Sequence, residues 1–186
     1  MARVAEPVKT QVSPEEYLAF EESSSERHEF VAGQVFAMAG GTTRHNKIAG
    51  ALYARALAAN NDPSCEVFIE NVKLMLEDES YCYPDVMICC EEDSSELRYR
   101  RCPCFIAEVL SESTEAIDRG EKLLNYQKLE SLQTYALISQ DEARVEVFSR
   151  LPDGAWRYQL LEGDAVLKVP CAKFEVKVSE LFRGIA

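Results

Sequence analysis

Residues 105–110 constrain the fold more than any other segment, because they form an apolar run interrupted by a single acid, Glu108. A nearly continuous apolar run predicts a strand that is buried on both faces of a sheet. A carboxylate in such a strand loses its hydration, which costs on the order of several kcal/mol unless the group is paired or bound to a metal. The sequence therefore predicts a charged partner for Glu108.

A second acid, Asp85, ends a Tyr-Pro-Asp sequence and opens another apolar run, residues 86–90. Two acids on two neighbouring core strands indicate a divalent-cation site. Mg²⁺ is held by a few carboxylates and keeps several waters, one of which can become the nucleophile in phosphodiester hydrolysis. The chain has 32 acids, so the pair alone is weak evidence, and the position of Glu108 inside an apolar strand strengthens it.

A Ser/Thr-rich turn follows Glu108, and a long amphipathic helix is expected at about residues 113–129. Within it, Asp118, Lys122 and Tyr126 recur every four residues and so lie on one face. Side chains tilt toward the helix N-terminus, so the Lys122 ammonium can reach back to Glu108 and there position a water or stabilise charge on a phosphate. The alternative is a surface ion pair between Lys122 and Asp118, worth only about 0.3–0.5 kcal/mol. The spacing does not decide between the two.

Helix and strand signals alternate along the rest of the chain. Ser13, Pro14 and Glu16 are typical of a helix start, with Ser13 at the N-cap and Glu16 closing a capping box. The other expected elements are a hairpin at residues 27–38 with Gly33 near its turn, a helix at about 44–60, strands at 66–70, 72–76 and 134–138, a hairpin at 144–161 and a last helical turn at 179–182. This mixture predicts an α/β protein.

Length and charge narrow the class of protein. Residues 1–186, with 47% apolar content, are expected to form one domain, flexible at residues 1–12. The net charge of -12 argues against non-specific coating of nucleic acid, although the basic residues 98–101 either contact a phosphate backbone or form a solvated loop. No stretch is long and apolar enough to span a membrane or to serve as a signal peptide. A cytoplasmic protein without membrane contact is expected.

The seven cysteines give no metal-binding pattern. Cys89 and Cys90 are neighbours, and Cys102 and Cys104 are close together, in or beside expected core strands. No Cys-x-x-Cys pair is present, which argues against a zinc ribbon and against a disulfide framework. Reduced, mostly buried thiols are therefore expected.

Several segments, taken in order, resemble the Uma-type restriction endonuclease family of the PD-(D/E)xK nuclease superfamily. The resemblance extends from about Ser13 to Leu181, and the ordered combination of motifs is specific although each motif alone is loose. The segments that carry it are residues 27–33, residues 38–41 with His45, residues 83–86, residues 108–115 and residues 118–122 with Tyr126.

The resemblance implies a restriction-endonuclease-like core, in which a central mixed sheet lies between helices. The hairpin expected at 144–161 would be an extra β-hairpin near the C-terminus. The resemblance also implies that Asp85 and Glu108 bind the metal and that Glu29 is a third acid of the site. The alternative for Glu29 is a surface ion pair with Arg27. The superfamily pattern places a lysine two residues after the glutamate, where this chain has Leu110.

In the Uma-type group the lysine is instead supplied by the following helix, which matches Lys122. Tyr126 and Gln127 are lesser candidates for the site or its surroundings. His45 is similar to a motif position at the start of the second helix, where it contacts a phosphate or the edge of the site, or else serves as a capping or core histidine.

Together these observations predict a Mg²⁺-dependent endodeoxyribonuclease, with Mn²⁺ as a substitute metal and no organic cofactor. Asp85, Glu108, Lys122 and Glu29 are the expected catalytic residues. DNA is the expected partner, and a homodimer would suit a nuclease that cuts both strands. The alternative is a catalytically inactive module that keeps the nuclease fold as a DNA-binding or protein-interaction unit.

Overall fold

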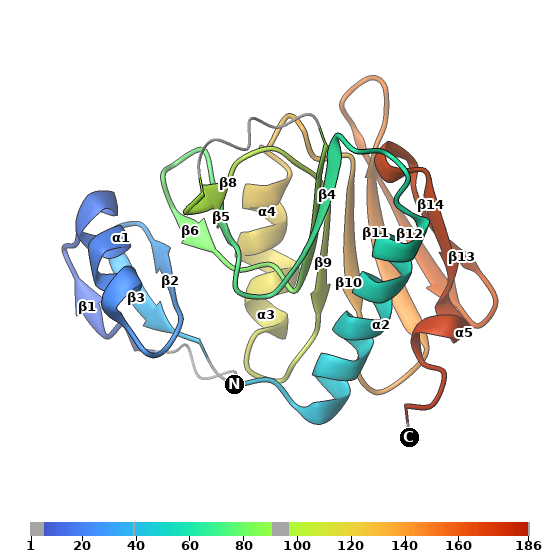
Figure 1. The fold of residues 1–186 in the computed structure, drawn as a ribbon, viewed down its shortest axis with the longest axis horizontal. Helices are drawn as coiled ribbons and strands as arrows, with labels where there is room; N and C mark the ends of the chain where they lie inside the picture. Colours follow the sequence, from blue (N-terminus) through green and yellow to red (C-terminus); the bar gives the residue numbers. More distant parts are fainter. Residues whose placement is uncertain (1–5, 39, 91–96, 186) are drawn as a thin grey trace.

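The computed structural model describes residues 6–38, 40–90 and 97–185. Its centre is a six-stranded mixed sheet with the strand order β12-β11-β10-β9-β7-β4 (Figure 1). Strands β9 and β10 run parallel, and the pairs β7–β9 and β10–β11 are antiparallel. The strands are β4 (Cys65–Ile69), β7 (Val86–Cys90), β9 (Pro103–Val109), β10 (Thr134–Ile138), β11 (Arg144–Arg150) and β12 (Trp156–Glu162).

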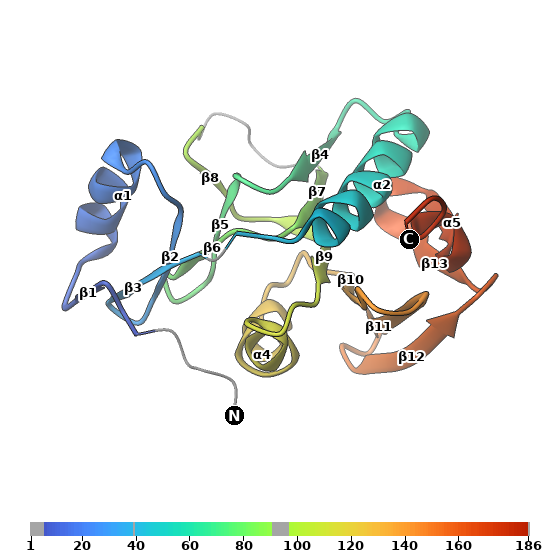
Figure 2. The ribbon, with the colours of Figure 1, turned by 90° about the horizontal axis from the view of Figure 1, so that it is seen from below.

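Helices cover both faces of this sheet, as Figure 2 shows for α2 on one side and α4 on the other. Helix α2 (Thr43–Ala59) packs on the face to which Phe105 and Ala107 of β9 point. Ile106 points to the opposite face. Because side chains alternate along a strand, Glu108 also lies on that second face. Burial on both faces explains the apolar run, and the strand predicted there is confirmed.

The helix predicted after β9 is present over residues 115–126, shorter than expected, but it is not α-helical throughout. It consists of α3 (Glu115–Ile117), a π-helical turn (Asp118–Lys122) and α4 (Leu123–Tyr126). The hydroxyl of Tyr135, from the underlying strand β10, donates to the Asp118 carbonyl at 3.1 Å. This contact gives a carbonyl of the wide turn a partner outside the helix. Single π-helical turns inside α-helices are frequent at functional sites.

A second six-stranded sheet, with the order β1-β3-β2-β6-β5-β8, lies beside the first and carries α1 (Pro14–Ser23). The predicted N-cap is confirmed, since the Glu16 amide donates to the Ser13 hydroxyl at 3.2 Å. The hairpin predicted at residues 27–38 is also confirmed. The strands are β1 (Lys9–Thr10), β2 (His28–Val31), β3 (Gln34–Ala37), β5 (Lys73–Met75), β6 (Tyr81–Cys82) and β8 (Tyr99–Arg100).

One detail of this second sheet differs from the predictions. The flexible start does not include Lys9 and Thr10, because they pair with the edge of β3. The predicted strands at 66–70 and 72–76 are confirmed as β4 and β5, which belong to different sheets. Glu70 and Asn71 between them adopt positive φ values of 44° and 41°, and the chain changes sheet at this bend.

The chain ends in a two-stranded hairpin, β13 (Val166–Val169) and β14 (Phe174–Lys177), joined by a 3₁₀ turn (Pro170–Ala172) and followed by α5 (Val178–Leu181). The α/β class is confirmed. The hairpin expected near the C-terminus, at 144–161, is present and extends the central sheet as β11 and β12. In the described part of the chain, no helix is long and apolar enough to cross a membrane.

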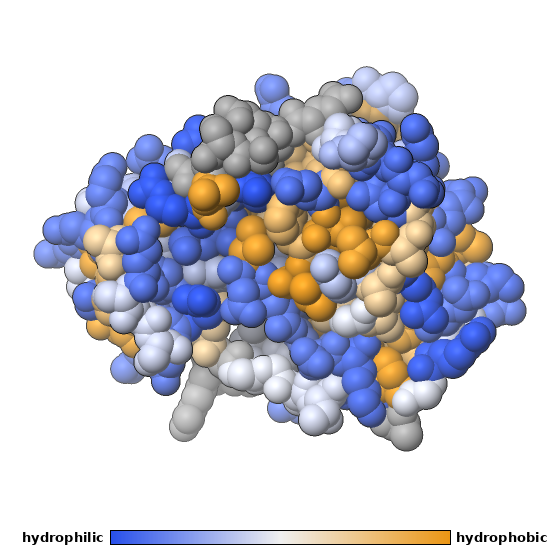
Figure 3. All heavy atoms as spheres, in the orientation of Figure 1, coloured by the Kyte–Doolittle hydropathy of each residue, from blue (hydrophilic) through white to orange (hydrophobic). Residues whose placement is uncertain are grey.

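Strand β4 forms the edge of the central sheet opposite β12. Val67, Phe68 and Ile69 of β4 are only partly buried. On the face drawn in Figure 3, hydrophobic residues gather in the middle, in the region of β4 and α2, within a mostly hydrophilic border. The apolar surface of this face therefore follows the exposed edge of the sheet.

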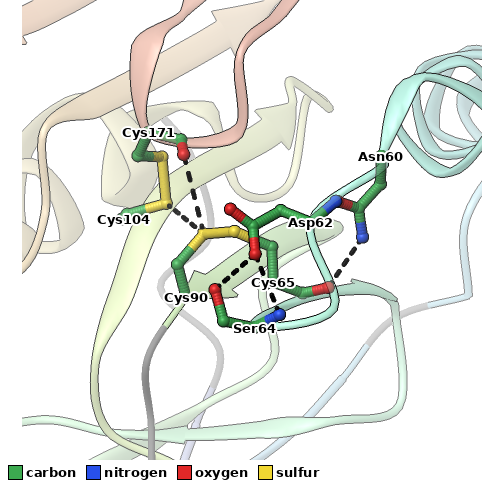
Figure 4. Close-up of a disulfide and its surroundings, with 7 residues drawn as sticks. All are labelled: Asn60, Asp62, Ser64, Cys65, Cys90, Cys104 and Cys171. Carbon is green, nitrogen blue, oxygen red and sulfur yellow. Dashed lines mark hydrogen bonds between the residues drawn. A yellow bond between two sulfur atoms is a disulfide. The ribbon is translucent and has the colours of Figure 1, made fainter.

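The expectation of reduced cysteines is wrong for four of the seven. Disulfides join Cys65 to Cys90 and Cys104 to Cys171 (Figure 4). Ile88 pairs with Phe105 and Cys89 with Pro103, so Cys104 is an extra residue at a β-bulge. The bulge turns Cys104 to the same face as Phe105, where strict alternation would have put it on the other. Sequence spacing alone could not reveal that reorientation.

Candidate active site

Asp85 and Glu108 lie side by side, as predicted for neighbouring strands. Strands β7 and β9 are antiparallel and Val86 pairs with Ala107, which sets the residue before Val86 opposite Glu108. The Val109 amide donates to Asp85 Oδ2 at 2.7 Å, and the Asp85 amide lies 3.4 Å from Glu108 Oε2. The backbone of each strand therefore holds the carboxylate carried by the other.

Glu108 is 3% exposed and has two side-chain partners from the helical segment. The Tyr126 hydroxyl donates to Glu108 Oε1 at 2.8 Å, and Lys122 Nζ lies 3.3 Å from the same oxygen. Burial raises the pKa of Glu108 well above its usual value, Lys122 opposes the shift, and Asp85 adds to it. The partner that the sequence required for this carboxylate is therefore a lysine together with a tyrosine.

Lys122 is surrounded by carboxylates. Its ammonium lies 3.1 Å from Glu29 Oε1, 3.3 Å from Glu108 Oε1 and 3.3 Å from Asp118 Oδ1. Burial lowers the pKa of Lys122, but Glu108, Glu29 and Asp118 together raise it well above the usual value. The three acids therefore favour the charged form of Lys122.

Both contacts considered for Lys122 occur at once. The ion pair with Asp118 is not on the surface, because the Asp118 side chain is only 2% exposed. The small energy of a surface pair does not apply to a buried one, whose disruption leaves an uncompensated charge. Burial also raises the pKa of Asp118, against the effect of Lys122.

His45 joins the site through its ring. The backbone amide of His45 donates to the Thr42 hydroxyl at 3.0 Å, which caps α2, and His45 Nε2 lies 3.0 Å from Asp85 Oδ1. This hydrogen bond to Asp85 raises the pKa of His45 despite its burial. A Cβ at Gly41 would lie 3.2 Å from the His45 ring, so the glycine leaves room for it.

Two of the predicted site residues, Glu29 and Gln127, make contacts other than those considered for them from the sequence. Glu29 contacts Lys122, while Arg27, its alternative partner, lies 4.0 Å from Glu21. Among the described residues, the ligand atoms of Glu29, Asp85 and Glu108 do not come within 4.8 Å of one another as a group. Gln127 is tied through its backbone, with its amide donating to Leu123 and its carbonyl accepting from Arg150.

The site carries more negative than positive charge, which suits a divalent cation. Four carboxylates meet one lysine and one histidine. Each oxygen of Asp85 has one hydrogen-bond partner, so each keeps a free lone pair. Glu29 Oε1 and Asp118 Oδ1 are buried within ion-pair distance of Lys122 but are not aligned for hydrogen bonds. Oxygen donors and excess negative charge fit a hard ion such as Mg²⁺.

Sequence reasoning missed a thiol in the site. Cys82 Sγ lies 3.3 Å from the Tyr126 hydroxyl. That hydroxyl already donates its proton to Glu108, so the thiol must donate to Tyr126. Burial raises the pKa of Cys82, which keeps the donor protonated. Nothing in the spacing of the sequence pairs Cys82 with Tyr126.

A buried network behind the site was also missed. Glu21 of α1, which is 1% exposed, accepts hydrogen bonds from the Tyr83 hydroxyl at 2.7 Å and from the His28 amide at 3.1 Å. Tyr83 precedes Asp85 by two residues, and His28 precedes Glu29. Glu21 therefore links the segment that carries Asp85 to the segment that carries Glu29.

Replacing Tyr83 with Phe should lower the free energy of unfolding by about 1.5–3 kcal/mol, because a hydrogen bond to a buried charged group is lost. Urea denaturation measures the change. Tyr158→Phe is the matched control. The Tyr158 hydroxyl lies 3.4 Å from Glu146 Oε2, and Tyr158 is 52% exposed. Equal effects in the two variants would contradict the role given to Glu21.

In the basic segment 98–101, Arg100 is buried, whereas Arg98 and Arg101 are exposed. Arg100 lies over the Phe68 ring at 5.1 Å and is 3.5 Å from Glu66 Oε2. Arg101 donates to the Tyr99 hydroxyl at 2.8 Å. Arg98 and Arg101 also border a hollow of about 370 Å³ beside α1. Arg100 is therefore part of the fold, and only its exposed neighbours face solvent.

The architecture and the position of the acids define a restriction-endonuclease-like fold. The chain is similar to the crystal structure of a putative nuclease belonging to DUF820 from Anabaena variabilis ATCC 29413, with a TM-score of 0.75 and 16% identity. The match covers 92% of this chain and 98% of that one. At this identity the likeness establishes the fold.

Sequence comparison gives the family. A model of the Uma2 family, described as "Putative restriction endonuclease", matches residues 14–179. Two Synechocystis sp. (strain ATCC 27184 / PCC 6803 / Kazusa) proteins are similar. Uncharacterized protein slr1290 is 32% identical over 177 residues, 94% of this chain and 93% of that protein. Uncharacterized protein sll1609 is 36% identical over 154 residues, which cover 80% of this chain and 86% of that protein. The chain belongs to the Uma2 family, and this supports a nuclease.

Proposed function

We propose that the protein is a Mg²⁺-dependent endonuclease that hydrolyses phosphodiester bonds in DNA, with Mn²⁺ able to replace Mg²⁺. The observation that carries the proposal is the buried Glu108, held between Asp85 on the neighbouring strand and Lys122 on the helical segment. The excess of carboxylates around one lysine supports a divalent cation. Family membership supports nucleic acid as the substrate.

Asp85 and Glu108 would hold the ion, which supplies a Lewis acid and lowers the pKa of a bound water. His45 and the Val109 amide fix the two oxygens of Asp85. Tyr126 fixes Glu108 Oε1. These contacts leave the carboxylates little freedom to turn away, so the site is organised before substrate binds.

Lys122 acts as a cation and not as a base, because its pKa is raised by Glu108, Glu29 and Asp118. A fixed ammonium stabilises the negative charge that grows on the phosphate as water attacks and the bond to the leaving oxygen breaks. Glu29 and Asp118 hold Lys122 in place. Mg²⁺ keeps several waters, so Glu29 can assist as a third acid through water without direct contact.

Metal removal tests this proposal. Protein treated with EDTA should not nick supercoiled plasmid, and added Mg²⁺ or Mn²⁺ should restore nicking. Calorimetric titration should show metal binding in the wild type and none in Asp85→Ala, while Asp153→Ala, at an exposed turn, should bind as the wild type does. If the protein binds DNA but does not cleave it with either Mg²⁺ or Mn²⁺, the result would instead favour the inactive DNA-binding module.

A further inference from the structure

Four cysteines meet at the end of β7 and β9 that is opposite to Asp85 and Glu108. Cys65 begins β4, Cys90 ends β7, Cys104 occupies the bulge near the start of β9, and Cys171 lies in the 3₁₀ turn of the C-terminal hairpin. Figure 4 shows the two disulfides next to each other. The cluster thus gathers four segments that are distant in the sequence.

One spacing between the two disulfides matches that of a tetrahedral thiolate site. Cys90 Sγ lies 3.7 Å from Cys104 Sγ across the gap between the disulfides. The sulfurs of Cys90, Cys104 and Cys171 all lie within 4.8 Å of one another, and Cys65 is bonded to Cys90. Four sulfurs at the usual zinc–sulfur bond length of about 2.3 Å are separated by about 3.8 Å in a tetrahedron. One edge of that tetrahedron is therefore already present.

We propose that reduction of these two disulfides creates a structural zinc site with Cys65, Cys90, Cys104 and Cys171 as ligands. Each disulfide takes two electrons and two protons from a dithiol reductant, which closes to its own disulfide. The four thiols then release their protons to solvent as Zn²⁺ binds. Rotation of the side chains then separates the two sulfurs of each former disulfide.

The surroundings of the cluster suit this chemistry. Cys90 and Cys171 are partly exposed, which gives a reductant and a metal ion access, whereas Cys65 and Cys104 are buried. The Cys65 amide donates to the Asp62 carbonyl at 3.1 Å, and Asn60 Nδ2 donates to the Cys65 carbonyl at 2.7 Å. A hydrogen-bonded turn thus holds the Cys65 backbone in place whether or not the disulfide is present.

Lys173, a cation, follows Cys171 by two residues in the sequence. A positive charge here would offset part of the net negative charge of four thiolates bound to one Zn²⁺.

This site differs from the one proposed at Asp85 and Glu108 in place and in chemistry. Carboxylate oxygens suit Mg²⁺, whereas four thiolates select a softer ion such as Zn²⁺. The two sites lie at opposite ends of the same strand pair. Zinc at the cysteine end would hold β4, β7, β9 and the C-terminal hairpin together without the disulfides, and binding of zinc would add to the stability of the reduced protein.

Titration of the full chain with Co²⁺ tests the inference. Protein reduced with a dithiol and desalted without oxygen should bind one Co²⁺ with the intense visible absorption of a tetrahedral thiolate site, and Zn²⁺ should displace it. Cys171→Ser should lose this absorption, and Cys102→Ser, at an exposed cysteine outside the cluster, should keep it. Asp85→Asn should also keep it, which separates this site from the proposed catalytic one.

A histidine variant distinguishes a metal site from a disulfide. Cys171→His cannot form the disulfide with Cys104 but retains a zinc ligand, so after reduction it should bind Co²⁺ with an altered visible spectrum. Circular dichroism of each variant checks that the chain is folded. Failure of the reduced wild type to bind Co²⁺ or Zn²⁺ in a one-to-one ratio would overturn the proposal, as would unchanged absorption in Cys171→Ser.

Discussion

Replacing Glu108 with Gln should reduce metal-dependent DNA cleavage by about 10²–10³-fold or more and should leave the metal-free protein at least as stable as the wild type. Glutamine keeps the shape of the side chain but removes a charge that is buried and surrounded by other acids. Burial raises the pKa of Glu108 in the folded protein. A carboxyl with a raised pKa stabilises the fold only at low pH, and this contribution is lost as the pH rises through the folded pKa.

At neutral pH the raised pKa of Glu108 therefore works against folding when no metal is bound, and replacing the carboxyl should not weaken the fold. Lys122 keeps Glu29 and Asp118 as partners. Plasmid nicking with Mg²⁺ and urea denaturation in EDTA measure the two effects. The control is Glu175→Gln, an exposed acid paired with Lys168 at 3.3 Å. Full activity in Glu108→Gln, or a loss of several kcal/mol in its stability, would refute this role.

The sequence predicted the elements that bring the acids together, because their signals are local. The apolar runs around Glu108 and after Asp85 predicted two core strands, and their pairing is confirmed. The capping box at Ser13 and the turn at Gly33 were likewise encoded within a few residues. The spacing of Lys122 allowed it to reach Glu108, although spacing alone could not choose between Glu108 and Asp118.

What the sequence did not predict depends on contacts between distant segments. The burial of Asp118 depends on the π-helical turn above β10. The clustering of four cysteines depends on a β-bulge at Cys104, which changes the face of one side chain. The buried contact of Glu21 with Tyr83 joins α1 to the segment before Asp85. No local pattern distinguishes these residues from others of the same type.

Replacing Lys122 with Met should lower the free energy of unfolding by about 3–5 kcal/mol at neutral pH. The ammonium is the shared partner of Glu29, Glu108 and Asp118, and a methionine would leave their charges buried without compensation. Cleavage should be lost as well. Lys128→Met is the control. This lysine is exposed, and among the described side chains its only hydrogen-bond partner is Asn125.

The pH dependence of this loss distinguishes charge from packing. Glu108 and Asp118 have pKa values raised by burial, and removing the nearby cation should raise them further. Their destabilising ionisation appears as the pH rises through these folded pKa values. Lys122, whose own pKa is raised, stays charged from acid to neutral pH, but it has less negative charge to compensate once Glu108 and Asp118 are protonated. Urea denaturation in EDTA should therefore show that Lys122→Met differs from the wild type much less in mild acid than at neutral pH. A difference of equal size at both would mean that the methionine disturbs packing instead of charge.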